Sequence, residues 1–113
     1  MKISRIRVND PWFTYIKNGA KKYEGRRNNR IFNEGEYLLI QHNTDECQDP
    51  VTKMLKKIHK FKTFEEALSI LPLEEVLPGV KTVEEGVQIY YKFVSLETQL
   101  RDGVVMLELE EAY

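Results

Sequence analysis

Three charged residues stand close together early in the chain, and their types suit a polar or anionic ligand. They are Lys21, Glu24 and Arg26. In an extended segment over 22–26, alternate residues share a face, so we expect Glu24 and Arg26 to lie close enough to pair. A guanidinium presents a planar fork that suits a phosphate or the edge of a base. Such a pair also serves structure alone in many proteins, and both interpretations stay open at this point.

Aromatic side chains near these charges suit a ligand with a flat ring. Trp12 is the only tryptophan, and it either stacks on a base or packs under the first helix. Tyr90 and Tyr91 are neighbours in a helical segment, so one of them must point away from the core. We expect the outward tyrosine, taken as Tyr91, to offer its hydroxyl to a ligand. Gly25 has no side chain, which lets a ligand approach the backbone there.

The charge of the chain is unevenly distributed along its length. The 113 residues have a formal net charge of −1 and the composition of one globular domain, 1–113. Residues 1–62 hold fourteen Lys and Arg against seven acids, and residues 63–113 hold three against eleven. A basic face of this kind can focus an anionic ligand, or it can simply pair with the acidic half. The basic residues form two clusters, Lys17, Lys21, Lys22, Arg26, Arg27 and Arg30, and Lys53, Lys56, Lys57, Lys60 and Lys62.

The sequence also argues against several classes of protein. Cys47, His42 and His59 are too few and too scattered for a zinc site, and we expect neither a metal nor a cofactor. A single cysteine cannot form an internal disulfide, which agrees with a reducing compartment. No apolar run approaches the length of a membrane span, and no signal-peptide core follows the first residues. We therefore expect an intracellular protein, in the cytoplasm or the nucleus, with no membrane partner.

The order of predicted elements indicates an α+β fold. Asp10-Pro11 is typical of a helix start, and Asn18-Gly19 of a helix end. The sequences Thr63-Phe64-Glu65-Glu66 and Thr82-Val83-Glu84-Glu85 match capping boxes that begin two further helices. Residues 51–62 fit either a helix or a long twisted strand. The remaining predicted strands cover 2–8, 22–26, 37–40 (buried on both faces) and 105–110 (half-buried), which together suggest a small barrel or curled sheet covered by helices.

The segment from Gly19 to Arg26 reads Gly-x-Lys-x-x-Glu-x-Arg, directly after the first predicted helix. This pattern resembles the signature of the activating-signal-cointegrator homology (ASCH) family, which has a fold similar to the PUA domain. Further short segments stand in the order of the family over nearly the whole chain. The resemblance implies a small PUA-like β-barrel flanked by about three helices, and it favours a strand over 51–62. The matching segments include Pro11-Trp12-Phe13, Glu34-Gly35-Glu36, Leu77-Pro78-Gly79 and Gly103-Val104-Val105.

The resemblance implies a binding module as the leading function. ASCH members look like RNA-binding or nucleotide-binding domains. We therefore expect single-stranded RNA or a modified nucleotide to bind in a basic cleft between the first helix and the strand from Lys21 to Arg26. The residues expected to contact the ligand are Trp12, Lys21, Glu24, Arg26, Arg27 and Tyr91.

Two alternatives follow from other members of the family. Some small members are amidohydrolases that act on acylated cytidine nucleosides with a Lys, Thr and Glu constellation. The Lys of that set falls on Lys21, the Thr on Glu24, and the acid near Leu77-Pro78-Gly79, where this chain has no carboxylate. If the chain is an enzyme, the resemblance makes Lys21 and Glu24 the catalytic candidates. Other members belong to transcription coactivators, so a protein-interaction domain with a protein partner is the further alternative.

Overall fold

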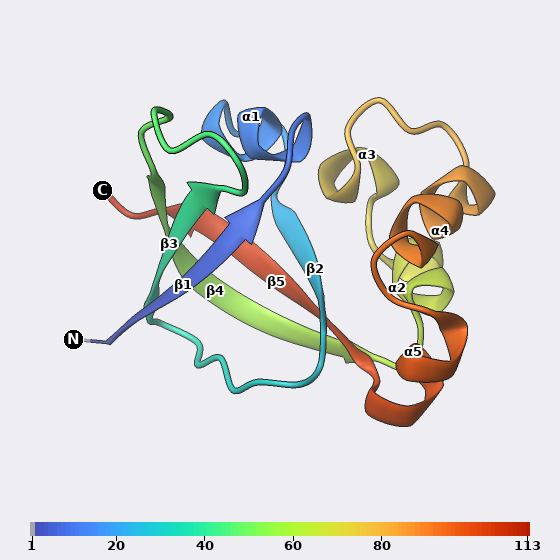
Figure 1. The fold of residues 1–113 in the computed structure, drawn as a ribbon. Coiled ribbons are helices and arrows are strands. Elements are labelled where there is room, and N and C mark those ends of the chain that lie inside the picture. The colour runs from blue at the N-terminus through green and yellow to red at the C-terminus, as the bar shows by residue number, and fades with distance from the viewer. Residues whose placement is uncertain (1) are drawn as a thin grey trace.

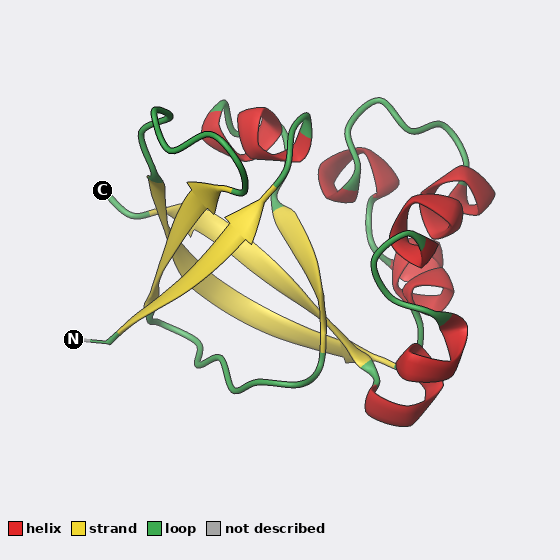
Figure 2. Cartoon of the chain, in the orientation of Figure 1, coloured by secondary structure: helices red, strands yellow, loops and turns green. Residues whose placement is uncertain are grey.

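A curled sheet of five strands and a group of short helices make up the fold, which is α+β (Figures 1 and 2). The computed structural model describes residues 2–113. The strands are β1 (Ile3–Val8), β2 (Tyr23–Arg27), β3 (Tyr37–His42), β4 (Val51–Phe61) and β5 (Val104–Glu111). The helices are α1 (Trp12–Lys17), α2 (Phe64–Ile70), α3 (Leu73–Val76), α4 (Val83–Tyr91) and α5 (Leu96–Asp102).

The sheet has the order β1-β3-β4-β5-β2 and curls into a half-barrel with β1 and β2 as its edges. The β1–β3 pair is parallel, and the other three pairs are antiparallel. The segment 51–62, which the residues alone left open, forms strand β4 over 51–61 and pairs with β3 on one side and β5 on the other. Its pairing with β5 shifts register between Leu55 and Lys57, and such a bulge increases the local twist that curls a sheet.

Two apolar cores share strand β5. Phe13 and Ile16 of α1 pack into the inside of the half-barrel with Val105, Leu107 and Leu109. The outside of the sheet packs against α2 and α4, where Val104 and Met106 meet the helices. Residues 104–107 are therefore all buried, whereas the sequence predicted a half-buried last strand. The prediction for 37–40 was also wrong, because its burial alternates, with only Leu38 and Ile40 fully covered.

The described residues contain five helices, two more than the sequence led us to expect. Thr63 and Thr82 cap α2 and α4, since their hydroxyl oxygens accept from Glu66 N and Glu85 N at 3.2 Å. Ser95 caps the unexpected α5 in the same way, through Thr98 N. Figure 1 shows α2 to α5 gathered at one side of the half-barrel, with α1 across one end. None of the helices over residues 2–113 is long and apolar enough to cross a membrane.

Four lysines of the second basic cluster lie on β4, and two of them, Lys53 and Lys56, pair with acids on β5. Lys56 Nζ lies 3.7 Å and His59 Nε2 lies 2.8 Å from the two oxygens of Glu108, and Lys53 pairs with Glu111. The basic and acidic halves of the chain therefore meet where β4 pairs with β5. At Lys53 and Lys56 the basic cluster therefore pairs with the acidic half of the chain, which was one of the two interpretations of the charge pattern.

Candidate functional site

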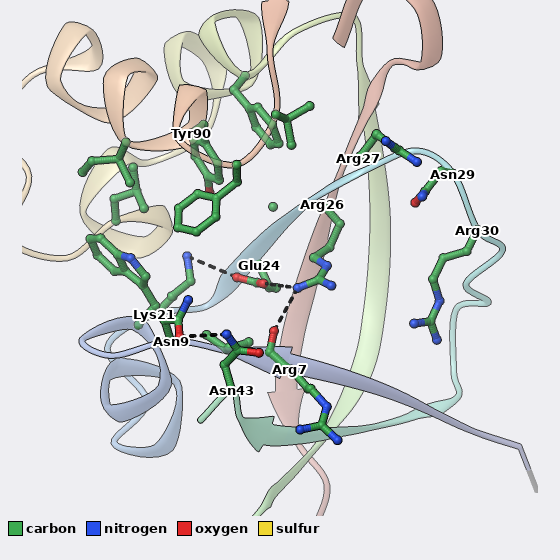
Figure 3. Close-up of a pocket in the computed structure, with 18 of the residues that line it drawn as sticks. Arg7, Asn9, Lys21, Glu24, Arg26, Arg27, Asn29, Arg30, Asn43 and Tyr90 are labelled. Carbon is green, nitrogen blue, oxygen red and sulfur yellow. Dashed lines mark hydrogen bonds and ion pairs between the residues drawn. The ribbon is translucent and has the colours of Figure 1, made fainter. Parts of the chain in front are cut away.

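A cleft of about 380 Å³ opens beside the two edge strands of the half-barrel (Figure 3). Arginines of β1, β2 and the following loop form one wall, and aromatic and apolar residues of α1, α2 and α4 form the other. The cleft is thus placed at the open seam of the sheet. The charged or polar residues that line it are Arg7, Asn9, Lys21, Glu24, Arg26, Arg27, Asn29, Arg30 and Asn43.

Arginine side chains bridge the seam between β1 and β2. Arg26 Nη1 donates to the backbone oxygen of Arg7 at 3.2 Å, and Arg30 Nη1 donates to the backbone oxygen of Arg5 at 2.9 Å. Edge strands present unpaired backbone groups, and these two bonds satisfy carbonyls of β1 without adding a strand. The bridge holds Arg26 and Arg30 at the cleft, where their remaining N–H groups are available to a ligand.

Glu24 lies between two cations on the floor of the cleft, as Figure 3 shows. Its Oε1 is 3.8 Å from Lys21 Nζ and its Oε2 is 3.3 Å from Arg26 Nη1. Glu24 is 7% exposed and is the only carboxylate among the described residues that line the cleft. A buried carboxylate with paired cations offers fixed acceptor positions to a ligand N–H.

Lys21 is almost completely buried, with 2% of its surface exposed. Its ammonium donates to the backbone oxygen of Val76 in α3 and lies 5.6 Å from the centre of the Trp12 ring. Burial lowers the pKa of Lys21 to about 8, and the charge of Glu24 opposes that shift without cancelling it. An amine of this kind exchanges a proton near neutral pH, which an exposed lysine does not.

A stacked aromatic pair forms the back of the cleft. The rings of Phe64 and Tyr90 lie 3.9 Å apart between centres, and their planes differ by only 5°. Gln99 fixes this pair from behind, since its Oε1 accepts from Phe64 N at 2.9 Å and its Nε2 donates to Val94 O at 3.0 Å. A Cβ at position 25 would lie 2.6 Å from the Tyr90 hydroxyl oxygen, so glycine allows β2 and α4 to approach closely.

The structure brings together five of the six residues that the sequence singled out for a ligand. Trp12, Lys21, Glu24, Arg26 and Arg27 all line the cleft, and Arg27 also pairs with Asp102 at 3.5 Å. The sixth, Tyr91, is 36% exposed and is not among the lining residues, whereas its neighbour Tyr90 is. The hydroxyl at the cleft therefore comes from the inward tyrosine of the pair, which the sequence argument assigned to the core.

Other lining residues carried no signal in the sequence. Arg7 and Asn9 come from the end of β1 and the turn after it, and Asn43 Nδ2 donates to Asn9 Oδ1 at 3.0 Å. They reach the cleft through the parallel pairing of β1 with β3, which local sequence patterns do not reveal. Within residues 2–113 no group of three or more His, Cys, Asp or Glu is arranged to hold a metal ion.

The half-barrel and its covering helices define the chain as a PUA-like domain with a cleft at the open seam. The model of the ASCH domain family matches residues 6–111, and the chain belongs to that family. No match was found among curated proteins.

Solved structures agree with this assignment. The hypothetical protein PH0355 is 29% identical with a TM-score of 0.85, covering 96% of this chain and 98% of its own. Protein PF0455 from Pyrococcus furiosus, solved by NMR, is 30% identical with a TM-score of 0.76, covering 98% of each chain. A mutant of ZmASCH from Zymomonas mobilis shares the fold at 14% identity, with a TM-score of 0.70 over 98% of this chain and 70% of its own.

Proposed function

We propose that this chain binds single-stranded RNA or a nucleotide, modified or not, in the cleft between α1 and β2. One observation carries the proposal: an arginine wall faces an aromatic wall across a single pocket. Five basic side chains and one carboxylate line the pocket among the described residues. A nucleotide has the same division, with a flat apolar base at one end and an anionic phosphate at the other. Membership of the ASCH family supports the proposal, since ASCH domains are generally RNA-binding.

The two walls suggest how the ligand lies. Its base enters between Trp12 and the stacked pair of Phe64 and Tyr90, because splayed bases stack on aromatic rings. Glu24 accepts a hydrogen bond from an N–H of the base or a hydroxyl of the sugar. The phosphate lies over the arginine wall, where Arg7 and Arg30 are exposed at the rim.

Fluorescence anisotropy of a short labelled single-stranded RNA, titrated at several salt concentrations, tests this function. The variant Arg26→Ala/Arg30→Ala removes two cations from the cleft wall. Lys57→Ala/Lys60→Ala is the matched control, because it removes the same charge from exposed residues of β4 that do not line the cleft. Binding to wild type should weaken with salt, and the log–log slope should become shallower by roughly 0.7 for each phosphate that the variant no longer neutralises.

Comparison of the two double variants shows whether RNA binds in the cleft or is attracted by net charge alone. Weaker binding and a shallower slope for the arginine variant alone would support the cleft. Equal weakening in both double variants would mean that net charge, not the cleft, attracts RNA. No binding by wild type at low salt would contradict the RNA form of the proposal.

The burial of Lys21 also favours a second candidate, hydrolysis of a small acylated nucleoside. An amine with a pKa of about 8, next to a buried carboxylate, is a group that can hold or move a proton during attack by water. No carboxylate from segment 77–79 lines the cleft, so Glu24 would be the only carboxylate there to assist Lys21. Hydrolysis of an acylated cytidine to cytidine and the free carboxylic acid, abolished in Lys21→Met, would support this activity, and no hydrolysis of any of a panel of acylated nucleosides would exclude it.

A further inference from the structure

The hydroxyl of Tyr90 is a polar group that the packing of the protein does not explain. Tyr90 is 7% exposed, and its oxygen is buried with no hydrogen-bond partner of good geometry among residues 2–113. Buried hydroxyls are nearly always hydrogen-bonded, since an unpaired one gives up its hydrogen bonds to water and gains nothing in return. A phenylalanine at this position would keep the stacking on Phe64 and avoid that cost.

The position of this oxygen links it to the candidate site. Tyr90 lines the cleft, and its hydroxyl points toward the floor that Lys21 and Glu24 form (Figure 3). It lies beside Gly25, the one position of β2 at the cleft that has no side chain. Burial and the nearby charge of Glu24 raise the pKa of Tyr90 well above its ordinary value. The backbone of Gly25 lowers this pKa, but by less. The phenol therefore stays protonated and able to donate.

Glu24 and Tyr90 thus offer two complementary groups from neighbouring elements. The carboxylate only accepts, and the protonated phenol donates. Arg26 and Lys21 hold the carboxylate, and the Phe64 ring holds the phenol. A ligand that satisfies both must carry a donor beside an acceptor on one edge, as the hydrogen-bonding edge of a nucleobase does.

We propose that Tyr90 is a specificity-determining residue of the cleft, whose hydroxyl donates to an acceptor atom of a nucleobase while Glu24 accepts from the adjacent N–H. This inference rests on the proposed nucleotide-binding function and goes beyond it by naming the two groups that recognise the base. It also assigns the hydroxyl contact to Tyr90 in place of Tyr91.

Two phenylalanine variants test this assignment, because each removes one hydroxyl and keeps the ring. Calorimetric titration with each of the four ribonucleoside 5′-monophosphates is done on wild type, Tyr90→Phe and the matched control Tyr91→Phe. Thermal unfolding of the three free proteins is measured in parallel. We expect Tyr90→Phe to weaken the tightest nucleotide by roughly three- to tenfold, the value of one hydrogen bond. We expect its Tm to be equal to or above that of wild type, and Tyr91→Phe to bind as wild type does.

The outcomes separate this inference from the function on which it rests. If wild type binds a nucleotide and Tyr90→Phe binds it equally well, the role of Tyr90 is overturned while the nucleotide site stands. A Tm of Tyr90→Phe below that of wild type would also overturn it, because the hydroxyl would then stabilise the fold of the ligand-free protein. If wild type binds none of the four nucleotides, the inference falls together with the mononucleotide form of the proposed function.

Discussion

Gly25 of β2 lies directly against Tyr90 of α4. A Cβ at position 25 would stand 2.6 Å from the Tyr90 hydroxyl oxygen and 2.9 Å from a ring carbon of Phe64. The strand and the helix that enclose the cleft therefore approach this closely only because residue 25 has no side chain. The aromatic wall and the floor of the cleft depend on that contact.

Gly25→Ala should destabilise the fold by about 1–3 kcal/mol, because the added methyl group overfills a packed site. Chemical denaturation of wild type and variant measures the free energy of unfolding. Because the nearest atom is the Tyr90 oxygen, the double variant Gly25→Ala/Tyr90→Phe should be destabilised less than Gly25→Ala is. An alanine at position 25 that costs nothing, or equal destabilisation with and without the hydroxyl, would contradict the close approach.

Lys21 gives the stability of the protein a dependence on pH. Its pKa is about 8 in the folded protein and 10.5 without burial, so the unfolded chain binds more protons between those values. The free energy of unfolding should therefore rise as the pH increases from about 8 toward 10.5, by up to roughly 3 kcal/mol. Below pH 8 both states are protonated, and this contribution should not change.

The control for this pH dependence is Lys21→Met, which removes the titrating amine and keeps an unbranched side chain. The difference in unfolding free energy between wild type and variant, measured from about pH 7 to pH 9.5, isolates Lys21 from other titrating groups. A difference that stays constant over this range would mean that Lys21 is not desolvated as the structure has it.

The cap of α4 should stabilise the helix that carries Tyr90. Thr82 Oγ1 accepts from Glu85 N at 3.2 Å, and replacement of a capping threonine by alanine costs about 1 kcal/mol. Thr82→Ala should therefore lower the Tm by roughly 4 °C, whereas Thr82→Ser keeps the accepting oxygen and should have a smaller effect. If the serine variant is as unstable as the alanine variant, packing of the threonine methyl group, and not the cap, supports the helix.

Short sequence motifs predicted most of the helices and strands, because interactions between residues close together in the chain determine where these elements begin and end. The capping boxes at Thr63 and Thr82 and the end of α1 before Gly19 all depend on residues within one helical turn. Helix α5 escaped prediction because Ser95 has no Glu or Gln three residues later to complete a capping box. The choice of a strand for 51–61 needed the family resemblance, since the spacing of the apolar residues there suits both a helix and a strand.

The site was predictable only where a local motif carries it. Lys21, Glu24 and Arg26 fall within one motif, and the structure brings them to one cleft. The contacts of Arg26 with Arg7 and of Phe64 with Gln99 join residues far apart in the chain, so no local pattern reveals them. The same holds for the choice between Tyr90 and Tyr91, because tertiary packing decides which face of α4 meets the cleft.

The most direct test of the cleft as the nucleotide site is an NMR titration of the ¹⁵N-labelled protein with a short single-stranded RNA. The cleft predicts that the indole N–H of Trp12 and the amides of Gly25 and Arg26 shift together, with one common dissociation constant. The chemical shifts of the Lys57 and Lys60 amides on β4 should not change. Shifts confined to the lysines of β4, with Trp12 and Gly25 unchanged, would show that RNA binds elsewhere and would contradict the proposed function.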